Sequence, residues 1–204
     1  MVHQPAGTQV GIDVGLLSFY TDSDGYSVEN PRHYRKAEKR LKRLHRRVSR
    51  KQKGGKNRTK ARQRLAKRYL KVQRQREDFA RTTASTLVSS HDLIAYERLQ
   101  IRNLVRNRKL AKSIHDAGWS QFMRWVNYYG LVQDVVVIAV EPHWTSQDCS
   151  GCGTRVKKSL SVRTHICPSC GLVLDRDENA ARNILAKAIG DGTLGHRETG
   201  EFVS

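Results

Sequence analysis

The sequence has few acidic residues for its length. Its 204 residues include 19 Asp and Glu against 38 Lys and Arg, which gives a formal net charge of +19 at pH 7. A compact protein with this imbalance repels itself unless a polyanion neutralises it. Nucleic acid is therefore the expected partner, and an acidic membrane surface is the weaker alternative.

Long apolar runs are also missing. The longest purely apolar run, Val135 to Val140, is far shorter than the roughly 20 residues that span a membrane. Met1 to Gly7 lacks the basic and apolar regions of a secretory signal. Because 38% of the residues are hydrophobic, the chain can still build a core. These features predict a globular protein of a reducing compartment, with no membrane association.

Cysteine is scarce, and its placement is specific. All four cysteines occur in two Cys-x-x-Cys pairs, Cys149/Cys152 and Cys167/Cys170. Two such pairs can complete a tetrahedral thiolate shell around one zinc ion, which would then hold structure without an open position for chemistry. Two disulfides or a thioredoxin-like redox pair are the alternatives, and a chain without a secretory signal favours zinc. His143 and His165 lie nearby and could be ligands, but we interpret them as polar side chains of a ribbon.

One long segment is almost free of acids. From Arg32 to Arg76 there are thirteen Arg and nine Lys against the single acid Glu38. Apolar residues recur at helical spacing on both sides of Gly54-Gly55, which predicts an antiparallel helical hairpin. A merely solvated face would mix charge signs, so we interpret the hairpin as an arm that contacts phosphates. The residues assigned to this contact are Arg40, Arg43, Arg46, Arg47, Arg50, Lys51, Arg58, Lys60, Arg62, Arg64, Lys67 and Arg68.

Several segments with strand character predict the sheet of an α/β fold. Gln9 to Thr21 is β-branched and aromatic, and a turn at Asp22 to Gly25 is expected to pair it with Tyr26 to Val28 as a β-hairpin. His91 to Tyr96 has the composition of a short buried strand. Val135 to Val140 is the most apolar segment, so we expect it to be central in the sheet.

Three carboxylates stand at comparable points of this pattern. Asp13 lies inside the first strand, Glu97 directly follows a later strand, and Asp177 begins the last predicted helix. Each has an ordinary alternative, such as a helix N-cap for Asp177. Together they fit a site where carboxylates hold two divalent ions, which activate water and stabilise the departing oxygen of a phosphodiester. Magnesium suits such a site because it takes few carboxylates.

The motifs and their order resemble one family. The chain contains GIDVG, NPRHYRKAEKRLKRLHRRVSRKQKG, DLIAYERLQIRNLVRN, LAKSIHDAGW, TSQDCSGCG and LDRDENAARNIL. These resemble the TnpB family, transposon-encoded RNA-guided DNA nucleases with a RuvC-type domain and a zinc ribbon. The resemblance runs from about Val10 to Ile189. It implies an RNase H-like fold, magnesium-dependent DNA cutting, and a guide RNA that directs the protein to its target.

The resemblance also implies roles for individual residues. The RuvC acids would be Asp13, Glu97 and Asp177, where Asp177 is chosen over Asp175 because it directly precedes x-Asn-Ala-Ala. The zinc ligands would be Cys149, Cys152, Cys167 and Cys170. The RuvC-like domain would comprise residues 1–30, 91–142 and 175–190, interrupted by the hairpin at 31–90 and the zinc ribbon at 143–174. Residues 191–204 would form a flexible tail.

The chain departs from the family pattern in two places. The family has a long portion before the first RuvC acid, and here only twelve residues precede Asp13. We therefore expect a C-terminal half, from a truncated copy, a mis-assigned start or a fragment. Arg98 stands where the family has an acid or Asn, so it could pair with Glu97 or face outward toward DNA.

The expected function follows from the resemblance and the charge. It is an RNA-guided DNA endonuclease acting in a prokaryotic cytoplasm, on the nucleoid when bound to DNA. The alternative is a catalytically idle nucleic-acid-binding remnant of a transposase.

Overall fold

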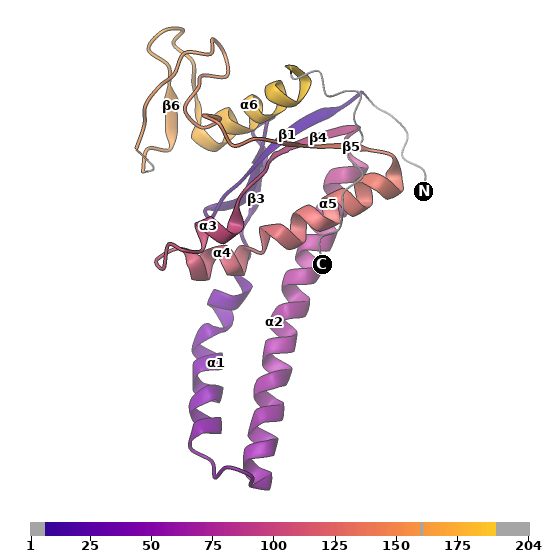
Figure 1. Ribbon diagram of the computed structural model, residues 1–204, viewed down its shortest axis with the longest axis vertical. Helices are drawn as coiled ribbons and strands as arrows, with labels where there is room; N and C mark the ends of the chain where they lie inside the picture. Colours follow the sequence, from indigo (N-terminus) through magenta and orange to yellow (C-terminus); the bar gives the residue numbers. More distant parts are fainter. Residues whose placement is uncertain (1–6, 160, 191–204) are drawn as a thin grey trace.

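A five-stranded mixed sheet lies at the centre of the computed structural model, which describes residues 7–159 and 161–190 (Figure 1). The strands are β1 (Gln9–Val14), β2 (Ser18–Asp22), β3 (Ser27–Glu29), β4 (Leu93–Glu97) and β5 (Val136–Val140), in the order β3-β2-β1-β4-β5. The first three strands are antiparallel, whereas β4 and β5 run parallel to β1. The fold is therefore mixed α/β, as predicted. The predicted tail at 191–204 lies outside the described residues.

The first predicted strand is wrong in its extent. Gln9 to Thr21 forms two strands, because the chain reverses between them and Gly15 N donates to Phe19 O at 3.2 Å. The reversal lets β1 and β2 pair side by side, with Ile12 and Phe19 fully buried in the same core. The β-hairpin expected here is consequently a three-stranded meander, in which Asp22 to Gly25 connects β2 to β3.

The predicted place of the most apolar strand is also wrong. Among the described strands β5 is at the edge of the sheet, paired only with β4. Its apolar character comes from helices on both faces, since Val137 packs on the core beneath α5 (Trp119–Gln133), whereas Ile138 and Val140 pack beneath α6 (Arg176–Gly190). Two covered faces produce the same continuous apolar run as a central position.

Helices cover the two faces of the sheet unequally. On one face, α5 and the last turns of α2 (Lys56–Ser89) enclose the larger core, with Phe19, Phe122 and Val126 at full burial. On the other face the helix within the described residues is α6, which packs against β1, β2, β4 and β5. Two short helices, α3 (Ile101–Leu104) and α4 (Ala111–Ala117), connect β4 to α5. No helix within the described residues is both long and apolar enough to cross a membrane.

The predicted helical hairpin is present and projects away from the sheet (Figure 1). Helix α1 (His33–Ser49) packs along α2 through a small separate cluster that contains Ala37, Leu41 and Val72. The base of the hairpin is fixed to α4 by the buried Asp116. Its two carboxylate oxygens accept hydrogen bonds from the backbone N–H groups of Tyr34 and Arg35 at 2.7 and 2.9 Å, so Asp116 caps α1 from another helix.

Candidate active site and zinc ribbon

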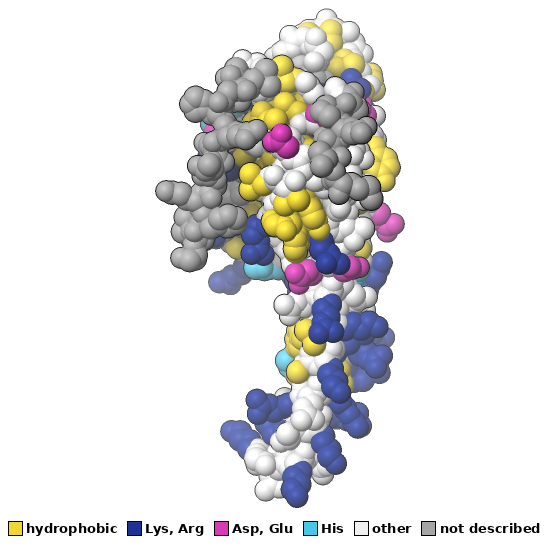
Figure 2. All heavy atoms as spheres, turned by 90° about the vertical axis from the view of Figure 1, so that its right-hand side faces the viewer, with side chains coloured by type: hydrophobic (Ala, Val, Ile, Leu, Met, Phe, Trp, Pro, Cys, Tyr) yellow, Lys and Arg dark blue, Asp and Glu magenta, His cyan; other side chains and the backbone are white. Residues whose placement is uncertain are grey.

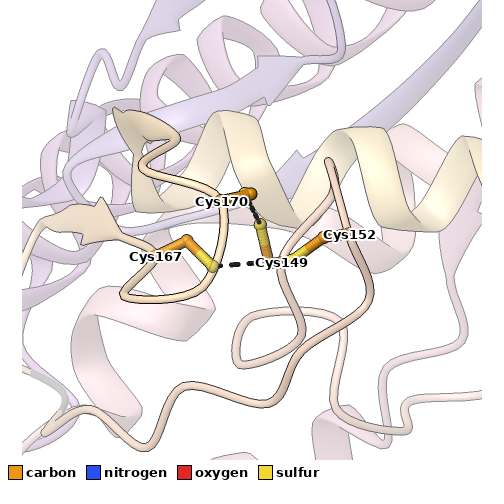
Figure 3. A group of neighbouring side chains, drawn as sticks. All are labelled: Cys149, Cys152, Cys167 and Cys170. Atoms are coloured by element: carbon orange, nitrogen blue, oxygen red, sulfur yellow. Dashed lines mark hydrogen bonds between the residues drawn. The ribbon is translucent and has the colours of Figure 1, made fainter.

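The four cysteines come together in one cluster beside α6 (Figure 3). Their sulfur atoms all lie within 4.8 Å of one another, and the Sγ–Sγ distances are 3.6 Å for Cys149–Cys170 and for Cys152–Cys167. None of the four forms a disulfide. Four sulfurs at zinc–sulfur distances of about 2.3 Å in a tetrahedron are separated by about 3.8 Å. The residues therefore fit one structural zinc ion.

The two histidines near the cysteines are not members of that cluster. His165 lies on β6 (Thr164–Ile166), which pairs with β7 (Val173–Asp175), and its side chain is fully buried. Its Nδ1 lies within hydrogen-bonding distance of Lys158 Nζ. Burial, with a smaller contribution from Lys158, lowers the pKa of His165. His165 is thus a ribbon side chain outside the cysteine cluster, as interpreted, and it lies in the interior of the ribbon.

The three predicted acids line a single cavity of about 300 Å³ at the end of the sheet next to the ribbon. Asp13 comes from β1, Glu97 from the carboxyl end of β4, and Asp177 from the first turn of α6. Because β1 and β4 are parallel neighbours, their carboxyl ends lie at the same edge of the sheet, which is the usual position of a ligand site in such sheets.

The surroundings of Asp13 change its pKa. Burial, followed by repulsion from Asp177 and Glu97, raises its pKa to about 8. The carboxyl group therefore retains a proton at neutral pH when no cation is bound. A divalent cation would relieve the same repulsion, and the three carboxylates supply the hard oxygen ligands that magnesium takes. The donor set of the cavity thus fits that ion.

Glu97 is held by a residue of the segment that leads into the ribbon. Thr145 Oγ1 donates a hydrogen bond of 2.8 Å to Glu97 Oε2, and Thr145 itself is buried. The adjacent Arg98 forms an ion pair at 3.3 Å with Glu141, and both of these side chains are more than half exposed. Of the two expectations for Arg98, this contact favours the outward-facing one.

Asp175 and Asp177, at the start of α6, have different roles. Asp175 Oδ1 accepts hydrogen bonds from the backbone N–H groups of Asp177 at 2.7 Å and Glu178 at 3.4 Å, so Asp175 is the helix cap. The ordinary alternative for Asp177, an N-cap, therefore does not apply. Its carboxylate accepts hydrogen bonds from Arg176 at 3.0 and 3.1 Å and from Arg163 at 3.2 Å.

The acids are neighbours without forming a tight cluster. Among the described residues only the four cysteines bring three or more potential metal ligands within 4.8 Å of one another. The partners of the acids give a physical reason, because Arg163 and Arg176 hold Asp177 while Thr145 holds Glu97.

Two asparagines, which our sequence analysis did not identify, join the ribbon to α6. Asn179 is fully buried, accepts a hydrogen bond from Ser150 N at 3.0 Å and donates one to Asp148 O at 2.8 Å. Asn183 Nδ2 donates to Thr145 O at 2.8 Å and to Asp148 O at 2.7 Å. Their i,i+4 spacing places both on one face of the helix, and that spacing is the signal in the sequence.

The basic residues assigned to phosphate contact lie on the projecting hairpin. Figure 2 shows Lys and Arg side chains gathered over it, at a distance from most acidic side chains on the visible face. Ten of the twelve assigned residues are exposed, and Arg58 and Arg68 are half-buried. Arg58 Nη1 donates to Lys51 O at 3.1 Å, which ties the start of α2 to the end of α1. The surface is therefore positively charged and accessible.

Comparison with known proteins identifies the family. A family model described as "Probable transposase" (OrfB_IS605) matches residues 2–108, and a model described as "Cas12f1-like, TNB domain" matches residues 119–184. The chain belongs to the OrfB_IS605 family of transposases, and the resemblance to TnpB is confirmed.

Individual relatives agree with this assignment. A Streptomyces pristinaespiralis protein named "Putative RNA-guided DNA endonuclease" is 42% identical over 208 residues, covering 96% of this chain and 50% of the relative. The Escherichia coli K12 protein "Putative RNA-guided DNA endonuclease InsQ" is 31% identical over 198 residues, covering 89% and 49%. The chain thus spans about half the length of these relatives.

A solved structure shares the fold. The "Cryo-EM structure of the Cas12f1-sgRNA-target DNA complex" contains a chain that is 18% identical to this one, with a TM-score of 0.63. The match covers 91% of this chain and 51% of that chain.

Proposed function

We propose that this chain carries the catalytic half of an RNA-guided DNA endonuclease of the TnpB type. The observation that carries the proposal is the single cavity that collects Asp13, Glu97 and Asp177 from three separate elements. The strand order, with an antiparallel meander followed by two parallel strands, supports a RuvC-type, RNase H-like domain. On this basis residues 1–30, 91–142 and 175–190 form that domain, 31–90 the basic arm and 143–174 the zinc ribbon.

The chemistry we assign to the cavity is hydrolysis of a DNA phosphodiester. Magnesium bound there would supply the positive charge that activates water and stabilises the departing oxygen. The chain's own residues set the geometry. Thr145 orients Glu97, Asp175 caps the helix that presents Asp177, and the raised pKa of Asp13 means that its proton must leave before the carboxylate can bind a cation. Arg163 and Arg176 both pair with Asp177, and Arg176 lines the cavity, so its guanidinium group could bind the phosphate of an entering strand.

The basic side chains of the hairpin are suited to binding nucleic acid independently of its base sequence. Arg and Lys side chains on helices that project from the body can follow a phosphate backbone. We assign guide RNA and target DNA as the ligands. We further propose that the protein acts in a prokaryotic cytoplasm, and on the nucleoid when it is bound to DNA. Zinc in the ribbon would hold the start of α6 and therefore the position of Asp177.

Cleavage of single-stranded DNA by the full chain in the presence of magnesium tests the proposal. We expect magnesium-dependent nicking that Asp13→Ala and Asp177→Asn each abolish. Glu141→Gln is the matched control, because this exposed carboxylate near the same edge does not line the cavity. If the protein binds DNA with a steep salt dependence but cuts none, the chain is a non-catalytic nucleic-acid-binding remnant. The arginines that hold Asp177 are the observation that favours this second function.

A further inference from the structure

An exposed tryptophan lies at the edge of the acidic cavity. Trp144 lines the cavity together with the three acids, and half of its surface is accessible to solvent. The other two tryptophans pack in or against the core, where Trp119 is buried. Exposure of so large an aromatic side chain beside a polar cavity is not explained by core packing.

The backbone holds Trp144 in an uncommon conformation. Its φ of +59° lies in the left-handed region, which is rare for a bulky residue and costs free energy. The residues around it enforce this conformation. The Trp144 carbonyl accepts hydrogen bonds from Gln147 N at 2.8 Å and Asp148 N at 2.9 Å, and the next residue, Thr145, is held by Glu97 and Asn183.

A charged side chain supports one face of the ring. The Arg155 guanidinium lies 4.1 Å from the centre of the Trp144 ring. Arg155 is itself fixed by Asp148, with Nε–Oδ1 and Nη2–Oδ2 distances of 2.9 and 3.5 Å. The ring is therefore supported by a preordered ion pair and still keeps half of its surface open. Because the ring is already held in place, another planar group can stack on it without the entropy cost of ordering the tryptophan side chain.

We propose that Trp144, supported by Arg155, is a stacking platform for an unpaired nucleobase of the strand that enters the acidic cavity. The cavity lining supplies the rest of the complementarity, because Lys158 and Arg176 on its wall can meet the phosphates next to that base. An aromatic face accepts every base, which suits a site that must act on any sequence. The nature of the strand rests on the proposed function, whereas the platform itself rests on Trp144 and Arg155.

Binding without cleavage tests the platform separately from the chemistry. Fluorescence anisotropy with the full chain and labelled oligo-dT, in calcium instead of magnesium, gives the affinity at several salt concentrations. We expect Trp144→Leu to weaken binding by about 5- to 150-fold, the range for loss of one base–aromatic stack. The slope of affinity against salt should stay unchanged because no phosphate contact is lost. Trp144→Tyr, which restores an aromatic face, should recover most of the affinity.

A strand of the same length without bases is the matched control for stacking. The difference between wild type and Trp144→Leu should disappear on an abasic strand, since there is no base to stack. Zinc content and thermal unfolding of each variant show that the ribbon is intact. Equal loss on both strands, an unchanged affinity, or no binding of oligo-dT by the wild type would each overturn the platform. A wild type that binds through Trp144 but never cuts in magnesium would overturn the nuclease and leave the platform standing.

Discussion

Replacement of Gly11 by alanine should disturb the cavity without touching any of its acids. Gly11 lies on β1 two residues before Asp13, and the backbone of α6 packs directly on it. A Cβ atom at this position would lie 2.1 Å from Ala181 O and 2.8 Å from Leu185 N, both backbone atoms. Cβ atoms essentially never lie within 3.0 Å of such backbone atoms, so α6 would have to move away by about 0.9 Å, the difference between 3.0 and 2.1 Å. The same helix carries Asp177.

The expected losses follow from that displacement. Overpacking of this kind lowers the free energy of unfolding by about 1–3 kcal/mol, and misplacement of a catalytic group by 1 Å lowers the turnover rate by about 100-fold. Urea unfolding measures the first, and single-turnover cleavage of single-stranded DNA in magnesium measures the second. Zinc content should stay at the wild-type value, because the cysteines are not moved directly.

Gly190→Ala is the matched control for this prediction. It lies at the end of the same helix, and a Cβ there meets no atom within 4 Å. Its stability and activity should equal or exceed those of the wild type, since alanine is the better helix former. A Gly11→Ala protein as stable and as active as the wild type would refute the close approach of α6 to β1 and, with it, our account of how Asp177 is placed.

Two further predictions concern the metal site of the ribbon and the pH dependence of the free energy of unfolding. Cys167→Ser should lower the zinc content per chain and the melting temperature, whereas Ser169→Ala in the same knuckle should change neither; full folding after chelation would contradict a structural ribbon. The raised pKa of Asp13 predicts that, without magnesium, the free energy of unfolding falls as pH rises from about 4 to about 8, because the native state keeps a proton that the unfolded state releases. Urea titrations of wild type and Asp13→Asn should show a smaller fall in the variant; parallel curves would contradict the shift.

Much of the site could be predicted because its signals are local. The cysteine spacing predicts one metal cluster, and the four sulfurs do meet. Strand composition before Glu97 and a helix after Asp177 place two of the acids at element ends, whereas Asp13 is expected inside a longer strand. The structure brings all three to one cavity. The basic hairpin is likewise predicted from periodicity and two glycines, which do not depend on distant partners.

The features that were missed depend on contacts between residues far apart in sequence. The reversal between β1 and β2 has no strong turn signal apart from Gly15, and the edge position of β5 is set by the parallel pairing with β4. In the sequence, Asp175 and Asp177 are equivalent candidates for the helix cap. The structure distinguishes them, because the backbone N–H of Asp177 donates a hydrogen bond to the Asp175 carboxylate. Asp116 reaches across 81 and 82 residues to cap α1, a partnership that no local pattern encodes.

The apolar cluster of the hairpin is separate from the main core, and this separation affects how the length of the hairpin can change. Helix α2 has 34 residues, which corresponds to about 51 Å at 1.5 Å per residue. The buried α2 residues of the main core begin at Ala80, whereas Ala37, Leu41 and Val72 belong to a separate cluster of the hairpin. Removal or addition of whole turns in the outer part, matched in α1 and α2, would therefore change the length of the arm and leave the cavity in place. Under the proposed function, the length of nucleic acid that the arm contacts and the position of the cut can then vary independently.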